Sequence, residues 1–149
     1  MNDQLTPVQT GSLLCDAILA QAPDAIIFAG CDGLIRLWNR GAELLFGFPA
    51  VEVVGSSLDV IVPERFRKAH WDGFSQAVAS GYTRHGNSVR TTRALHRSGR
   101  KLYVDLSFGL VKDDSGSVVG SVAVARDGSV RYSAERALRE RLAALEGSP

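Results

Sequence analysis

Residues 21–48, QAPDAIIFAGCDGLIRLWNRGAELLFGF, contain two short β-rich runs around an Asp-Gly pair, and a short helical pattern follows them. The pair Asp32-Gly33 predicts a tight hairpin, because glycine adopts the positive φ that such a turn needs. Asn39 follows the second run and has a side chain suited to capping a helix. That helix ends at Gly47. The stretch therefore predicts the order strand, strand, helix.

The rest of the chain continues as a mixed α and β pattern. Further helices are expected over residues 10–22, 50–54, 63–80 and 129–146, and strands over residues 88–96, 101–111 and 117–126. In the second of these strands the alternation places five apolar residues on one face: Leu102, Val104, Leu106, Phe108 and Leu110. The two connections between the three strands carry Gly-containing turn sequences. Three consecutive antiparallel strands are therefore expected after the long helix.

The composition is that of one domain with short appendages. The chain has 149 residues, 45% of them hydrophobic, and a formal net charge of +1. A net charge so close to zero provides no basic surface that would attract nucleic acid. No apolar run is long enough to span a membrane. The N-terminus has no pattern of a secretory signal, so we expect a cytoplasmic location. Cys15 and Cys31 are expected to be free thiols.

Three phrases of this chain resemble the usual phrases of PAS domains, which are small sensory modules. They are residues 21–48, the helix start IVPERFR at 61–67 and the last strand SVAVARD at 121–127. The resemblance implies an α+β PAS fold with a five-stranded antiparallel sheet, helices on one face, and a flanking helix at each end. We expect the N-terminal flanking helix within residues 1–22, the PAS domain over residues 23–127, and a C-terminal signalling helix within residues 128–149.

The helix sequence AHWDGFSQAVASG, residues 69–81, is similar to that of haem-PAS oxygen sensors, both rhizobial oxygen-sensor kinases and direct oxygen sensor phosphodiesterases. The resemblance implies that His70 is the proximal ligand of a haem b iron. It also implies that Arg90 donates hydrogen bonds to bound oxygen, and that Leu106 and Phe108 crowd the distal haem face. Ser88 stands where the phosphodiesterases place a methionine ligand, so the resting ferrous iron is expected to be five-coordinate.

Other interpretations of the same residues remain open. His70 lies on the apolar face of its helix, one turn from Phe66 and from Phe74, and could be a core histidine that hydrogen-bonds a backbone group or a carboxylate. Arg90 could be exposed to solvent, or it could pair with a haem propionate or with an aspartate, Asp72 or Asp105.

Several other residues are weaker candidates. His85 and His96 are expected at the surface, although His85 could approach a propionate. Trp38 is expected in the core or an interface, and Trp71 at the edge of its helix. We expect no flavin photochemistry, because residues 55–66 lack the cysteine that flavin-binding PAS relatives carry there. Arg126-Asp127 resembles the pair that couples a PAS sheet to its outgoing helix.

The last helix carries an apolar stripe that resembles a PAS signalling linker. Leu138, Leu142 and Leu145 are flanked by Arg and Glu, as in a two-stranded coiled coil, although the helix could also fold back on its own sheet. We expect a homodimer through the terminal helices and a downstream effector domain or protein. No catalytic constellation appears, so the chain is not expected to be an enzyme. Two functions remain: a haem-based oxygen or gas sensor, and a cofactor-free module for dimerisation or for binding a small metabolite.

Overall fold

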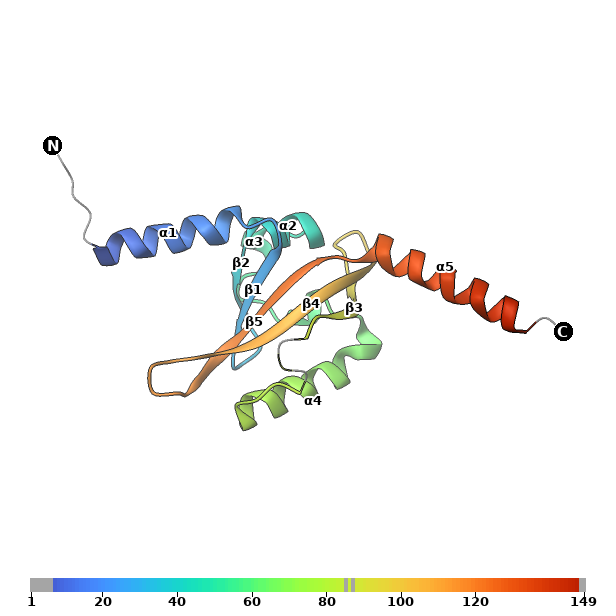
Figure 1. Ribbon diagram of the computed structural model, residues 1–149. Coiled ribbons are helices and arrows are strands. Elements are labelled where there is room, and N and C mark those ends of the chain that lie inside the picture. The colour runs from blue at the N-terminus through green and yellow to red at the C-terminus, as the bar shows by residue number, and fades with distance from the viewer. Residues whose placement is uncertain (1–6, 85, 87, 148–149) are drawn as a thin grey trace.

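A computed structural model describes residues 7–84, 86 and 88–147 (Figure 1). Its centre is one antiparallel sheet of five strands in the order β2-β1-β5-β4-β3. The strands are β1 (Ala25–Gly30), β2 (Ile35–Trp38), β3 (Arg90–Leu95), β4 (Lys101–Lys112) and β5 (Val118–Asp127). The first two strands therefore lie at one edge of the sheet and the third at the other edge, with the last two between them.

The predicted hairpin between β1 and β2 is present. Gly33 has φ of 76°, and its N–H donates to the carbonyl of Gly30 at 2.9 Å. The Asp32 side chain supports the turn by accepting from the N–H of Leu34 at 3.0 Å. A register shift after Phe28 then lets residues on both strands reach the core.

Short helices follow the hairpin: α2 (Arg40–Phe46), α3 (Ala50–Val53) and the 3₁₀ turn η1 (Leu58–Val60). Asn39 caps α2 as predicted, because its Oδ1 accepts from the N–H of Ala42 at 2.9 Å. Gly47 ends the helix with φ of 82°. Asn39 is itself buried, and it connects this helix to the start of β1, which the sequence alone did not indicate.

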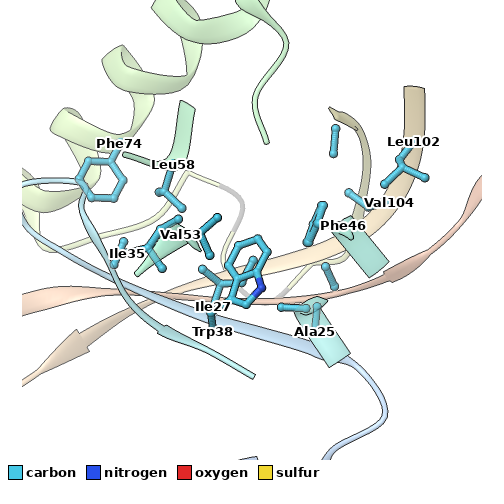
Figure 2. Close-up of a cluster of buried hydrophobic side chains, with 14 residues drawn as sticks. Ala25, Ile27, Ile35, Trp38, Phe46, Val53, Leu58, Phe74, Leu102 and Val104 are labelled. Carbon is cyan, nitrogen blue, oxygen red and sulfur yellow. The ribbon is translucent and has the colours of Figure 1, made fainter. Parts of the chain in front are cut away.

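The core lies between these helices and one face of the sheet. Figure 2 shows its side chains, with Phe46, Val53, Leu58 and Phe74 from the helices and Ala25, Ile27, Leu102 and Val104 from the strands. Trp38 belongs to this core, and its indole Nε1 donates to the carbonyl of Phe48 at 2.9 Å. The α+β fold with helices on one face of a five-stranded antiparallel sheet is therefore confirmed.

The longest internal helix, α4 (Glu64–Ser80), buries Phe74 and Ala77 against the core. The helix begins one residue after the predicted start, because Pro63 stands at its N-cap, and Gly81 ends it with φ of 75°. One prediction for this helix was wrong: Phe66 is 38% exposed, with the guanidinium of Arg65 4.6 Å above its ring. The first turn contributes no residue to the buried core, so the apolar stripe begins one turn later than the sequence suggested.

Two flanking helices leave the sheet in opposite directions, α1 (Pro7–Gln21) and α5 (Ser129–Glu146) (Figure 1). The described part of α1 is tied to the domain by Asn39, whose Nδ2 donates to the carbonyl of Leu19 at 2.9 Å. No residue of α5 is buried. The possibility that α5 folds back along the sheet is therefore not realised in this structure.

The strand expected from residue 88 is shorter than predicted. It begins at Arg90, which is paired with Leu106 of β4, and Ser88 and Val89 before it are exposed. The connection before it includes Gly86 with φ of 56°. Arg90 is consequently the first residue of β3 rather than an internal one.

Candidate functional site

His70 lies in the middle of α4 and is half-buried. Its imidazole meets the indole of Trp71 edge-on at 4.7 Å between centroids, and it lies nearly parallel to the ring of Phe74 at 6.3 Å. Trp71 and Phe74 also contact each other edge-to-face at 5.3 Å. Phe74 anchors this three-ring cluster in the core, so the helix holds the imidazole at the border between the core and solvent.

The Nδ1 atom of His70 is buried and has no hydrogen-bond partner among the described residues. Burial lowers the pKa of His70 below its usual value of 6.5, and the nearby negative charge of Asp59 opposes that change. The imidazole is therefore neutral near pH 7. A neutral imidazole is the form that binds a metal ion, and Nδ1 makes no structural hydrogen bond to the described residues.

Asp59 of η1 organises the surroundings of His70 but does not bond to it. Its Oδ1 accepts from Trp71 Nε1 at 2.7 Å, and its backbone carbonyl accepts from Arg67 Nη2 at 3.2 Å. The indole of Trp71 also packs so closely on Gly33 that a Cβ there would lie 2.4 Å from the ring. Trp71, expected at the edge of its helix, thus links α4 to the β1–β2 turn.

The other three candidate residues lie on β3 and β4. Arg90 pairs with Leu106 in the β3–β4 ladder, so their side chains share one face of the sheet. Leu106 and Phe108 are half-buried and pack against the core cluster, on the face that the helices cover. The structure therefore gathers Arg90, Leu106 and Phe108 on the sheet face towards α4, with His70 on that helix.

Arg90 is exposed, and the aspartates proposed as its partners bond elsewhere. Asp72 pairs with Lys68 at 2.9 Å. Asp105 accepts from Thr91 Oγ1 at 2.7 Å and also pairs with Arg131. Among the described residues no carboxylate is paired with Arg90, so its guanidinium extends towards solvent at the start of β3.

The remaining sequence candidates have other surroundings. His96 is half-buried, and its Nδ1 lies 2.9 Å from Ser98 Oγ in the β3–β4 turn, which makes it a turn residue. His85 lies outside the described residues. Cys15 and Cys31 are free thiols, as predicted, but both are exposed, whereas buried or semi-exposed thiols were expected. Within the described chain no three residues of the types His, Cys, Asp and Glu gather as a metal-binding group.

Two open hollows adjoin the first turn of α4, and sequence reasoning did not predict them. They have volumes of about 410 and 580 Å³ and share Arg65, Phe66 and Arg93 in their linings. His70 lines neither. The exposure of Phe66, against the helical periodicity, is the feature that opens them.

A polar and aromatic junction attaches α5 to the sheet, and the sequence did not reveal it either. Tyr132 stacks on Tyr103 of β4 at 3.8 Å between centroids. Arg131 pairs with Asp105, and together with Thr91 it holds the pKa of that carboxyl below its usual range through hydrogen bonds. The first turn of α5 is therefore fixed to β4.

Arg126 and Asp127 bond to different segments. Arg126 pairs with Asp24 before β1 at 2.9 Å, and Asp127 accepts from the N–H of Ser129, the first residue of α5, at 2.8 Å. The Asp127 bond is consistent with the expected coupling of the sheet to the outgoing helix. The end of β5 is thus bonded both to the residue before β1 and to the start of α5.

Comparison with known proteins places this architecture in a family. The family model described as the PAS fold matches residues 14–128, most of the chain. The chain belongs to the PAS family. Its strand order and the helices on one face agree with a solved PAS domain from Colwellia psychrerythraea, which has 19% sequence identity and a TM-score of 0.69 over 79% of this chain and 97% of that one.

Two curated relatives extend the comparison. The sensor protein FixL of Bradyrhizobium diazoefficiens is 37% identical over 54 residues, which are 36% of this chain and 11% of that protein. The oxygen sensor protein DosP of Escherichia coli is 26% identical over 112 residues, 75% of this chain and 14% of that protein. The PAS domain thus corresponds to a small part of each relative, and its similarity is to sensory proteins.

The residues around His70 fit a haem in their chemistry. One neutral imidazole with an unpaired buried nitrogen comes from α4, and apolar side chains come from β4. Arg90 supplies a cation at the same face of the sheet.

Among the described residues no helix has the length and apolar character needed to cross a membrane.

Proposed function

We propose that this PAS domain is a haem-based oxygen or gas sensor with His70 as the proximal iron ligand. The observation that carries the proposal is the buried Nδ1 of His70 without a hydrogen-bond partner. Leaving a buried nitrogen unsatisfied costs roughly 1–3 kcal/mol. An imidazole that is kept in this unfavourable state therefore favours a functional role for the ring. Iron would bind the neutral ring through its other nitrogen, Nε2, because Nδ1 is buried within the protein.

Haem supplies an iron centre that binds diatomic gases, and the protein supplies the surroundings. Leu106 and Phe108 would contact the flat macrocycle from the sheet, since both are half-buried on the face towards the helices. Arg90 would offer a charged hydrogen-bond donor to a polarised gas ligand or to a propionate. The two hollows lie at the first turn of α4, so the proposal depends on the imidazole and not on a preformed cavity.

The strand β4 offers a route from this site to the outgoing helix. Leu106 and Phe108 project from one face of β4, and Tyr103 and Asp105 project from the other. Tyr103 stacks on Tyr132, and Asp105 pairs with Arg131, both in the first turn of α5. A displacement of β4 by a bound ligand would therefore act directly on the start of α5, which would carry the signal to an effector domain or protein.

The apolar stripe of α5 supports a homodimer through the terminal helices. Leu138, Leu142 and Leu145 are 58%, 52% and 73% exposed, and they are spaced as a coiled-coil seam. An isolated helix of this length is marginal in water, so a second copy would stabilise it. Light scattering should show a dimer that Leu138→Glu weakens, whereas Ala137→Glu, off the stripe, should leave it intact.

Haem titration tests the site. Wild-type protein should develop a sharp, saturable Soret band, and His70→Ala should lose it or weaken haem binding by at least about tenfold. His96→Ala is the matched control, because that half-buried ring lies in the β3–β4 turn and not on α4, and it should bind haem as the wild type does. A Soret band of equal strength in both variants would remove the proposal.

A cofactor-free PAS module is the second candidate function, and the position of the hollows favours it. Both are lined by the first turn of α4 and by β3, away from His70. In that case the protein would remain colourless after incubation with haem, while dimerisation through α5 would be unchanged.

A further inference from the structure

The two hollows at the first turn of α4 share three lining residues beside β3, and together we name them the basic groove. Arg65, Phe66 and Arg93 line both hollows. One end of the groove reaches Lys101 at the start of β4, and the other reaches Tyr132 in α5. The groove is therefore elongated and follows the direction of a strand, which suits an extended chain better than a compact ligand.

Backbone groups of β3 face this groove without a strand to pair with. β3 is the last strand of the sheet, and its only ladder is with β4. The N–H of Leu95 points away from β4 and donates to the carbonyl of Ile61 at 2.9 Å. Alternate residues of a strand direct their backbone groups to the same edge, so Arg93 and Thr91 direct theirs outwards as well. No backbone partner for these two outward positions exists among the described residues.

The charged side chains around the groove are mostly cationic. Arg65, Arg93 and Lys101 line it, and no carboxylate within the described part of the chain pairs with any of them. Some arginines outside the groove are paired, for example Arg97 with Glu52 at 2.8 Å. Glu64 is the only acidic side chain among the described residues of the lining.

We propose that the basic groove binds an extended acidic peptide segment, which adds to β3 as a further strand. Main-chain hydrogen bonds to Thr91 and Arg93 would supply affinity, and carboxylates on alternate residues would pair with Arg65 and Lys101. The exposed ring of Phe66 would contact an apolar residue of the peptide. Because Tyr132 closes one end, such a peptide would touch the first turn of α5 and bias its position.

Fluorescence anisotropy with a labelled octapeptide of alternating glutamate and valine tests the groove. Wild-type protein should bind this peptide at low salt at least about tenfold more tightly than the matched glutamine–valine peptide. The double variant Arg65→Glu/Lys101→Glu should lose that preference. Arg65 is exposed in the first turn of α4, where a glutamate favours the helix, so the variant is expected to fold.

Two controls separate groove binding from general charge attraction. Arg40→Glu changes an exposed arginine outside the groove and should keep the preference for the acidic peptide. A glutamate–valine peptide N-methylated at alternate amides should bind at least about tenfold more weakly, because it cannot form the strand ladder. Amide NMR shifts should concentrate at Thr91 and Arg93.

The proposal is overturned if neither peptide binds, or if Arg40→Glu abolishes the preference as fully as the double variant does. It is also overturned if N-methylation has no effect, or if succinate displaces the peptide from the same residues at equal carboxylate concentration, because the occupant would then be a small anion. These outcomes are independent of haem, since all measurements use the protein without added haem.

Discussion

The two sides of the helix-covered sheet face differ in how completely their polar groups are satisfied. Around β1, β2 and α2, the buried Asn39 makes four hydrogen bonds and the Trp38 indole is bonded to a backbone carbonyl. Around α4 and β3, His70 keeps an unpaired buried nitrogen and the strand edge faces an open groove. The first region holds the fold together, and the second retains the unsatisfied groups that binding can use.

The largest effect that distinguishes the two regions is expected from Asn39→Ala. This residue is 6% exposed, and its loss leaves the N–H groups of Ile26 and Ala42 and the carbonyls of Leu19 and Asp24 without their partner. We expect the free energy of unfolding to fall by roughly 3 kcal/mol, measured by urea denaturation. A loss below about 1 kcal/mol would show that this region is not the stabilising one.

His70→Leu, in contrast to Asn39→Ala, should not lower the free energy of unfolding. Removing the unpaired nitrogen from the three-ring cluster should leave stability at pH 7 unchanged or raise it by about 1 kcal/mol. The pKa of His70 is lower in the folded state than its usual 6.5, so the unfolded state binds the proton more readily below that pH. Wild-type stability should therefore fall from pH 7 towards pH 5, and the variant should lose less. Parallel pH profiles would contradict this account of His70.

Asp105→Asn tests the attachment of α5. The substitution removes the ion pair with Arg131, whose guanidinium is half-exposed, so we expect a loss of about 1 kcal/mol at pH 7 and faster hydrogen exchange in the first turn of α5. The lowered pKa of Asp105 means that its contribution is present above its usual value of 3.8 and disappears as the pH falls through the lower folded value. Unchanged exchange in α5 would show that the junction does not hold the helix.

Lys68→Ala provides the smallest effect. The Lys68–Asp72 pair on α4 is highly exposed, with side-chain exposures of 90% and 64%. We expect a change below about 0.5 kcal/mol in the free energy of unfolding. A larger loss in the same urea experiment would mean that the solvent face of α4 contributes more to stability than its contacts indicate.

The sequence predicted those parts of the fold that depend on neighbouring residues. The turn at Gly33, the cap at Asn39 and the helical position of His70 all follow from local spacing, and the structure confirms them. The PAS resemblance extended these local signals to the order of the elements.

The features that the sequence did not reveal join residues far apart in the chain. Arg131 reaches Asp105 across 26 positions, and Arg126 reaches Asp24 across 102. No periodicity encodes such pairs, because they depend on how strands and helices are placed in space. The exposure of Phe66 was mispredicted for the same reason: helical spacing gives the face of a residue, but not where the core beneath that face begins.

Rescue by free imidazole tests most directly whether His70 donates its nitrogen to iron. In His70→Ala, haem binding should be lost, and added imidazole should restore the Soret band and the carbon monoxide difference spectrum of the ferrous protein. Imidazole should leave the His96→Ala spectra unchanged. The account is contradicted if His70→Ala binds haem as the wild type does without imidazole. It is also contradicted if the variant stays folded but added imidazole does not restore its Soret band.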